Sequence, residues 1–234
     1  MVAVVRRDVQ GAVLLLLGIL LLRLTLGGSY VYYVKVSMKP FLLLTAVVLL
    51  ALAAWSLWQA WRQSSDLVDD HGHNGVPQVA WLLVLPVLVV FLVSPRPLGA
   101  YTAARQLATA PVVAEPAELL PLPAGDPVDL PIADYITRAV WGQGQTLEGR
   151  DVRLTGFVTP DPDGGWWVTR LGLACCAADA LSFRARVLGA EALPANTWVE
   201  VDGRWVRGDS GDPAIPLIEA EDVTRIPEPG NPYE

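Results

Sequence analysis

Histidine and cysteine are scarce in this sequence, and their positions limit the chemistry that it can support. Two of each occur among 234 residues. Both histidines, His71 and His73, lie in the first hundred residues, so the rest of the chain holds no histidine-based catalytic triad. Glycine-rich phosphate loops, nucleophile elbows and His-Glu-x-x-His helices are absent from the sequence as well. We therefore predict that the protein is not an enzyme.

Charge is missing from long stretches of the first hundred residues. Residues 9–26 contain one charged side chain, Arg23, and residues 41–61 and 76–93 contain none. Helices of 18 to 21 residues rise about 27–32 Å, which is close to the hydrocarbon thickness of a bilayer. We therefore predict three transmembrane helices, which form a membrane domain over residues 1–100 embedded in a lipid bilayer.

Basic residues do not decide the orientation of these helices. Three Lys and Arg would lie on the side of the N-terminus and four on the other side. Because the first helix usually sets the orientation, we expect the N-terminus inside the cell. The protein is then a multi-pass protein of the cell membrane whose C-terminal domain is extracytoplasmic.

Positive charge is scarce after residue 100. Residues 101–234 carry ten Lys and Arg against twenty Asp and Glu, a formal charge of −10, whereas residues 1–100 carry +3. Phosphate groups are bound by basic surfaces. We therefore expect no nucleic acid among the partners of this protein.

Two patterns divide the acidic part of the chain. Residues 108–131 contain six prolines, which predict a semi-extended linker over residues 101–131. From Asp151 onward, the sequence indicates five short strands separated by Pro, Gly and Asp turns, and apolar and polar residues alternate in three of them. We therefore predict a soluble domain over residues 132–234, folded as a small OB-like five-stranded β-barrel.

The two cysteines, Cys175 and Cys176, are adjacent. Neighbouring thiols in a strand point to opposite faces, so both can hold one ion only within a turn. The residues that follow favour a turn, and Asp179 is close enough in sequence to act as a third ligand. Two thiolates and a carboxylate suit zinc or a softer ion. Two alternatives stay open, namely a strained disulfide and a small buried residue beside a bend.

His71 and His73 lie with three aspartates in the polar stretch between the second and third predicted helices. Imidazole and carboxylate groups in so short a stretch can bind zinc, copper or nickel. The alternative is a solvated polar loop, and the sequence leaves both open.

The cysteine pair lies in a longer motif. Arg170 is followed by Leu171, and the sequence then reaches Cys-Cys-Ala-Ala-Asp-Ala over residues 175–180. This resembles the YcgQ-like family of bacterial membrane proteins, whose central motif is an Arg-Phe pair followed by Cys-Cys-x-Ala-Asp-Ala. Leu171 departs from it by replacing the Phe. Further matching stretches are residues 94–99, 147–158, 169–174 and 198–205.

The resemblance implies a function that composition alone does not. Members are described as subunits of a two-component permease, so a membrane-embedded permease protein is the implied partner, with a link to zinc homeostasis. It also implies a functional role for Cys175 and Cys176, with Arg170 as part of the motif. Two hypotheses follow: an accessory membrane subunit of a permease, or a membrane-tethered thiol or metal sensor with no transport role.

Overall fold

The computed structural model divides the chain into two compact units, Met1–Arg96 and Pro97–Glu234. The boundary lies close to residue 100, where the charge of the sequence changes sign. Each unit is described by itself. The residues that the structure describes are 7–64, 85, 88, 89, 92, 93, 96–105, 119–162, 164–208 and 210–234.

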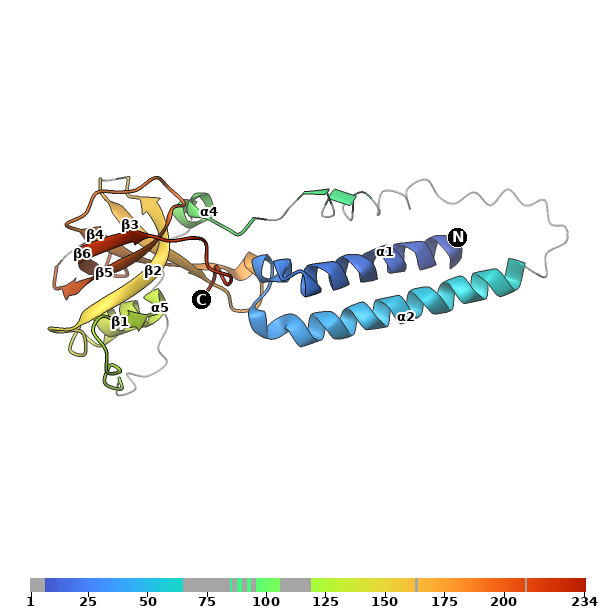
Figure 1. Ribbon diagram of the computed structural model, residues 1–234, viewed down its shortest axis with the longest axis horizontal. Helices are drawn as coiled ribbons and strands as arrows, with labels where there is room; N and C mark the ends of the chain where they lie inside the picture. The colour runs from blue at the N-terminus through green and yellow to red at the C-terminus, as the bar shows by residue number, and fades with distance from the viewer. Residues whose placement is uncertain are drawn as a thin grey trace. The chain divides into compact units, whose positions relative to one another are not determined.

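The first unit contains two long helices, α1 (Arg7–Leu26) and α2 (Lys39–Ser64). They run antiparallel and side by side, joined by the short 3-10 helices η1 (Ser29–Tyr32) and η2 (Val36–Met38) (Figure 1). Both are built from long apolar runs of good helix formers, mainly Leu and Ala. The two helices therefore form a hairpin.

Small residues bring the two helices of this hairpin together. A Cβ added to Gly11 would lie 2.9 Å from the side chain of Leu57, and one added to Gly18 would lie 2.8 Å from that of Leu50. A larger residue at either position would therefore force the facing leucine side chain to move. The close approach of two apolar helices along small residues is typical of helix pairs in membranes.

The prediction of three transmembrane helices is wrong. Among the described residues, one helix, Val36–Arg62, is long and apolar enough to cross a membrane, judged by length and composition. The apolar helix Gln10–Leu26 is shorter than that criterion requires. Most of residues 76–93, the third predicted helix, lie outside the described residues. An apolar run in the sequence gives only the composition of a segment. A transmembrane helix also requires that the segment form an unbroken helix of sufficient length.

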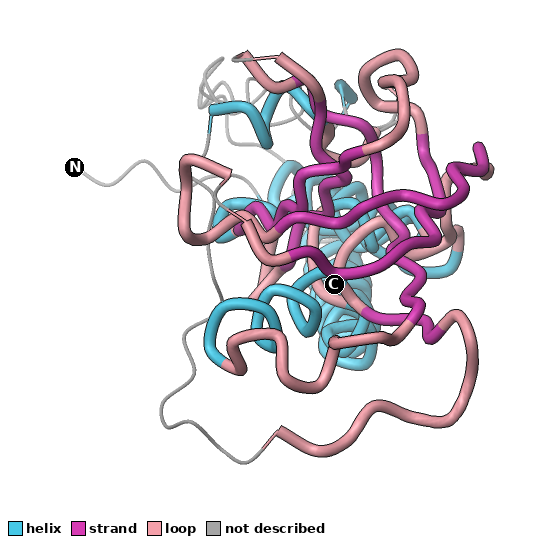
Figure 2. Tube along the Cα trace, turned by 90° about the vertical axis from the view of Figure 1, so that its left-hand side faces the viewer, coloured by secondary structure: helices cyan, strands magenta, loops and turns pink. Residues whose placement is uncertain are grey.

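The second unit is built on one six-stranded sheet, whose strands are drawn in magenta in Figure 2. The order is β1-β2-β3-β4-β6-β5, and β2 also pairs with β5. The pairs β1–β2 and β4–β6 are parallel, and the others are antiparallel. The strands are β1 (Val128–Leu130), β2 (Asp151–Pro160), β3 (Trp166–Gly172), β4 (Leu181–Leu188), β5 (Trp198–Val206) and β6 (Leu217–Arg225).

This mixed sheet is not the OB-like five-stranded β-barrel that the alternation predicts. The sixth strand, β1, has three residues and lies between Pro127 and Pro131, in the stretch predicted to be a linker. A strand so short shows no periodicity in the sequence. The short helix α4 (Ala100–Arg105) is also folded, whereas residues 106–118 lie outside the described residues.

The main core lies between the sheet and the segment that follows β1. This segment forms the helix α5 (Ile132–Ile136) and the single π-helical turn Thr137–Trp141. Ile132, Tyr135 and Ile136 are fully buried against apolar side chains of the strands. Trp166, on β3, is the largest of the fully buried side chains. This core fixes β3 and β4, and with them the loop that joins the two strands.

Candidate metal centre

The adjacent cysteines lie on the loop between β3 and β4. These strands pair up to Gly172 and Leu181, so residues 173–180, here called the Cys loop, close an antiparallel hairpin. Gly172 lies directly under Phe183, because a Cβ there would come within 2.4 Å of the Phe183 ring. The strands therefore bring the loop out at the end of the sheet.

Asp179 organises the turn that the cysteine pair requires. Its carboxylate accepts backbone N–H groups from Ala174 at 2.9 Å, from Cys175 at 2.8 Å and from Cys176 at 3.1 Å. The Asp179 N–H donates to the carbonyl of Cys176 at 3.0 Å and also reaches its side chain. These reciprocal contacts form a capping box around η5 (Ala177–Asp179).

The turn brings three possible ligand atoms together. The sulfurs of Cys175 and Cys176 and a carboxylate oxygen of Asp179 all lie within 4.8 Å of one another. Zinc bound to two thiolates at about 2.3 Å places the sulfurs about 3.8 Å apart, so a modest closure of the loop makes the site. Cys175 is exposed and the other two residues are half-buried, which leaves the site open to solvent.

Hydrogen bonds set the protonation of this group. The thiol of Cys175 donates to the carboxylate of Asp179, and this bond, together with a weaker contact to Cys176, raises the pKa of Cys175 to about 12. The same thiol, and then the three backbone N–H groups, lower the pKa of Asp179 to about 2. Near neutral pH the group is therefore a carboxylate with a protonated thiol, and a metal ion bound there would have to displace that proton.

Two family models match the chain. The model of the DUF1980 N-terminal domain matches residues 9–108, and that of the DUF1980 C-terminal domain matches residues 138–234. The chain belongs to the DUF1980 family. No curated protein and no solved structure matches it. The cysteine pair lies inside the DUF1980 C-terminal domain.

Arg170 of this DUF1980 chain does not join the three possible ligands. Arg170 lies near the end of β3, just before the Cys loop, and its guanidinium donates to the carbonyl of Asn231 at 2.7 Å. Its guanidinium also lies over the ring of Trp198, 5.1 Å from the ring centre. Burial lowers the pKa of Arg170, and the nearby carboxylate of Glu234 opposes this shift. The arginine of the motif thus holds a neighbouring segment of the domain in place.

That segment, residues 231–234, was not predicted to belong to the site. The Leu173 N–H donates to the Glu234 backbone oxygen at 3.1 Å, and the Glu234 N–H donates to the Leu171 carbonyl at 2.9 Å. The Glu234 side chain accepts the N–H groups of Ile132 at 2.8 Å and Ala133 at 3.0 Å. Prolines and glycine surround the segment, so its sequence predicts only a loop.

His71 and His73 of this DUF1980 chain lie outside the described residues. Their proposed role in metal binding therefore stays a prediction. The cysteines are both free thiols in the structure.

Proposed function

We propose that this DUF1980 protein is a membrane-anchored accessory subunit of a two-component permease, which binds a thiophilic metal ion at the Cys loop. Zinc is the expected ion. The observation that carries the proposal is the convergence of two thiols and a carboxylate within 4.8 Å on an exposed loop. The resemblance to the YcgQ-like family supplies the permease as the expected partner.

The chemistry of the donor set supports a metal that is held and then released. A structural zinc site is closed by four protein ligands, whereas three ligands leave a fourth position for water or for another molecule. Cys175, Cys176 and Asp179 offer three ligands on the surface. A partner protein can therefore approach the ion and supply the fourth ligand, which is what transfer between two proteins requires.

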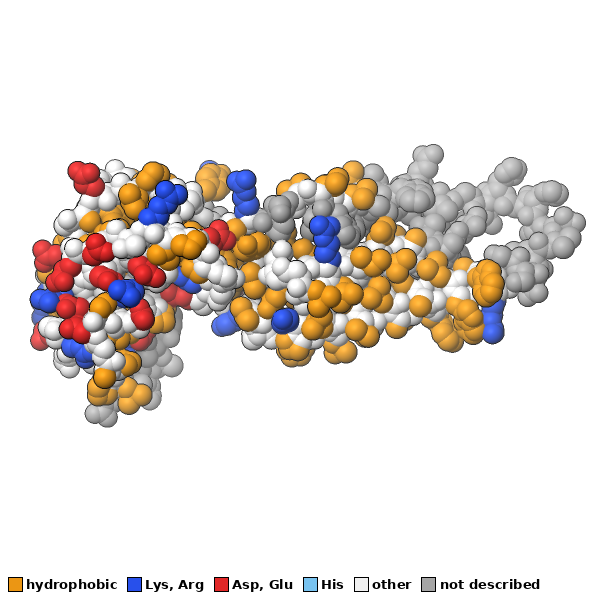
Figure 3. Space-filling model, in the orientation of Figure 1, with side chains coloured by type: hydrophobic (Ala, Val, Ile, Leu, Met, Phe, Trp, Pro, Cys, Tyr) orange, Lys and Arg blue, Asp and Glu red, His pale blue; other side chains and the backbone are white. Residues whose placement is uncertain are grey.

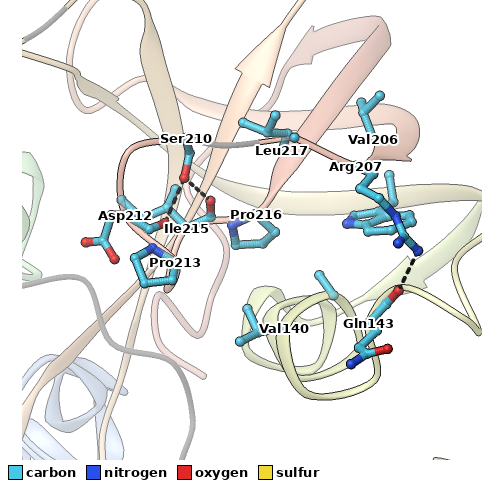
Figure 4. A pocket seen from close by; sticks show the side chains of 13 residues that line it. Val140, Gln143, Val206, Arg207, Ser210, Asp212, Pro213, Ile215, Pro216 and Leu217 are labelled. Carbon is cyan, nitrogen blue, oxygen red and sulfur yellow. Dashed lines mark hydrogen bonds between the residues drawn. The ribbon is translucent and has the colours of Figure 1, made fainter.

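The first unit supports attachment to a membrane. Large apolar side chains are exposed along both helices of the hairpin, drawn in orange in Figure 3. Toward the end of α2, Trp55, Trp58 and Trp61 are exposed, and the guanidinium of Arg62 lies 3.8 Å from the ring centre of Trp58. Tryptophan and arginine beside an apolar stretch favour the interface between the hydrocarbon core and the lipid headgroups. We infer that the hairpin is the membrane anchor.

Metal binding is tested on the full-length protein in detergent. We expect one zinc ion per chain by elemental analysis, and loss of this ion in both Cys175→Ser and Cys176→Ser. The double variant should lose no more than either single variant, because the two thiols act on one ion. Thr224→Ser, at an exposed position on β6, is the control. Zinc retained by both single variants contradicts the proposal.

The permease partner is tested separately. The protein is purified from its native membrane after chemical crosslinking, and the proteins that it carries are identified by mass spectrometry. We expect a polytopic membrane protein in equal amount. Metal binding without such a partner favours the second candidate, a membrane-tethered thiol or metal sensor. The observation that favours a sensor is that both thiols are free and Cys175 is exposed.

A further inference from the structure

Two residues at the base of the Cys loop lie in a small hydrophobic cluster that is separate from the main core. Leu173 opens the loop and Ala180 closes it, and both are buried. The other buried members of this cluster come from α4, from the strands and from the 231–234 segment. They are Ala100, Ala103, Phe157, Leu171, Trp198 and Tyr233.

The same cluster holds residues 97–105, here called the entry segment because the second unit begins with it. The Leu98 N–H donates to the Tyr233 hydroxyl at 2.9 Å, and the Ala100 N–H donates to the Asn196 side-chain oxygen at 2.7 Å. The residue between them is Gly99, where a Cβ would lie 2.4 Å from that same oxygen. The entry segment is therefore docked by specific contacts.

A buried arginine completes the docking. Arg184, which is 5% exposed, donates to the carbonyl of Ala103 and to the hydroxyl of Ser182, the latter at 2.9 Å. Its guanidinium lies 4.9 Å from the centre of the Trp167 ring. Since Ser182 and Arg184 lie on β4, directly after the Cys loop, the strand that ends the loop also holds α4.

Tyr233 contacts both the Cys loop and the entry segment. Its backbone forms a bridge with Leu171, and the next residue, Glu234, accepts the N–H of Leu173. Its ring lies in the small cluster, and its hydroxyl holds the N–H of Leu98. One side chain thus joins the base of the candidate metal site to the segment that leads to the first unit.

We propose that Tyr233 couples metal binding at the Cys loop to the docking of the entry segment. This inference rests on the proposed function of the Cys loop. A metal ion draws the ligands together and restrains Leu173 and Ala180, so the cluster that they share with the entry segment opens less often. Because such coupling is reciprocal, whatever loosens the entry segment must also weaken metal binding. Metal binding thereby stabilises the docked state of the entry segment, with which the second unit begins.

The experiment is amide hydrogen exchange of the full-length protein in detergent, with and without zinc. The readout is exchange at Leu98, Ala100 and Ala103, none of which carries a metal-ligating side chain. We expect zinc to slow exchange in the entry segment by about three- to tenfold, the range that the loss or gain of one hydrogen bond covers. Exchange at Val201, a residue of β5 that lies in the main core and not in the small cluster, serves as the internal reference.

Tyr233→Phe removes the hydroxyl and keeps the ring, so the cluster stays filled. We expect faster exchange at Leu98, loss of the effect of zinc there, and zinc affinity weaker by about three- to tenfold, as linkage requires. Tyr101→Phe is the matched control, because it makes the same change on α4, where the side chain is 68% exposed. It should leave both exchange and affinity unchanged.

The outcomes separate this inference from the proposed function. If the unaltered protein binds no zinc, both are wrong. The coupling is wrong if the protein binds zinc but zinc does not change exchange in the entry segment, and if Tyr233→Phe binds zinc as tightly as Tyr101→Phe does. The proposed metal site would be unaffected by that result. Slower exchange with zinc, abolished only by Tyr233→Phe, supports the coupling. Faster exchange at Val201 in Tyr233→Phe would mean that the variant is destabilised as a whole. In that case, the zinc affinity of the molecules that remain folded decides between these outcomes.

Discussion

The hydroxyl of Tyr135 donates a 2.6 Å hydrogen bond to the backbone carbonyl of Leu217, inside the core of the second unit. Tyr135 is fully buried on α5, and Leu217 begins β6, in the short parallel pairing with β4. This bond joins the helix that covers the core to a strand that follows it by more than eighty residues. It satisfies two polar groups that would otherwise be buried without partners.

Tyr135→Phe should therefore destabilise the second unit. The variant keeps the ring but leaves the Leu217 carbonyl without its donor, which costs about 1–3 kcal/mol for a buried group. Denaturant unfolding followed by tryptophan fluorescence measures the change. An unchanged midpoint would show that water replaces the hydroxyl. Tyr101→Phe, on the exposed side chain, is the control.

The same residue predicts how stability responds to alkali. Burial raises the pKa of Tyr135 far above its ordinary value of 10. The folded state therefore keeps a proton that the unfolded chain loses, so this contribution to stability is complete below about pH 10 and falls as the pH rises further. Unfolding measured between pH 8 and pH 11 should show a steeper loss for the unaltered protein than for Tyr135→Phe. Parallel curves would contradict this prediction.

Asp179→Asn should make Cys175 more reactive. The carboxylate is the main cause of the raised pKa of this thiol, so its removal lets the thiol ionise at lower pH. Because the thiolate is the nucleophile, alkylation by iodoacetamide at pH 8 should be faster by about tenfold or more. Peptide mass spectrometry reports each cysteine separately. Equal rates in both proteins would mean that the thiol does not donate to Asp179.

Zinc affinity should fall as the pH falls. The pKa of Cys175 is raised to about 12, so below that pH the ion must displace its proton. Displacement of one proton weakens affinity about tenfold for each unit of pH. Titration calorimetry in buffers of different ionisation enthalpy counts the protons released. Release of none near neutral pH would exclude thiolate coordination by Cys175.

Gly18→Val should weaken the helix hairpin. The added side chain would collide with the side chain of Leu50 and lie close to its backbone nitrogen, so the packing of the two helices must change to accommodate it. Overpacking of this kind costs about 1–3 kcal/mol. Ala51→Val, at an exposed position of α2, is the matched control. Unfolding of the helices in mixed detergent, followed by circular dichroism, should separate the two variants.

The strands were predictable where the side chains alternate, and their pairing was not. The first half of β2 and the middle of β5 alternate between buried and half-buried side chains, whereas β3 and β4 are buried on both faces over most of their length. β1 is too short to show a period, and the parallel contact of β4 with β6 joins strands that the sequence separates. Alternation of apolar and polar residues shows that one face of a strand is buried. The order in which the strands pair depends instead on which buried faces pack into the same core.

The candidate site, too, was predictable from the sequence only in part. The need for a turn at Cys175 and Cys176 follows from the geometry of adjacent residues, and the structure provides that turn through Asp179. The role of Asp179 as a ligand stays a prediction. The contribution of Tyr233 had no local signal, because it depends on a long-range contact with Leu98.

The position of Glu234 beside the Cys loop has a practical consequence for purification. Its backbone oxygen accepts the N–H of Leu173, which lies two residues before Cys175. Any polypeptide joined after Glu234 therefore starts within a few residues of the candidate ligands. A hexahistidine tag placed there would offer imidazole groups to the same ion, so apparent zinc content and affinity would belong partly to the tag. A tag without histidine, or one that is cleaved off before the measurement, leaves the measured stoichiometry to the protein.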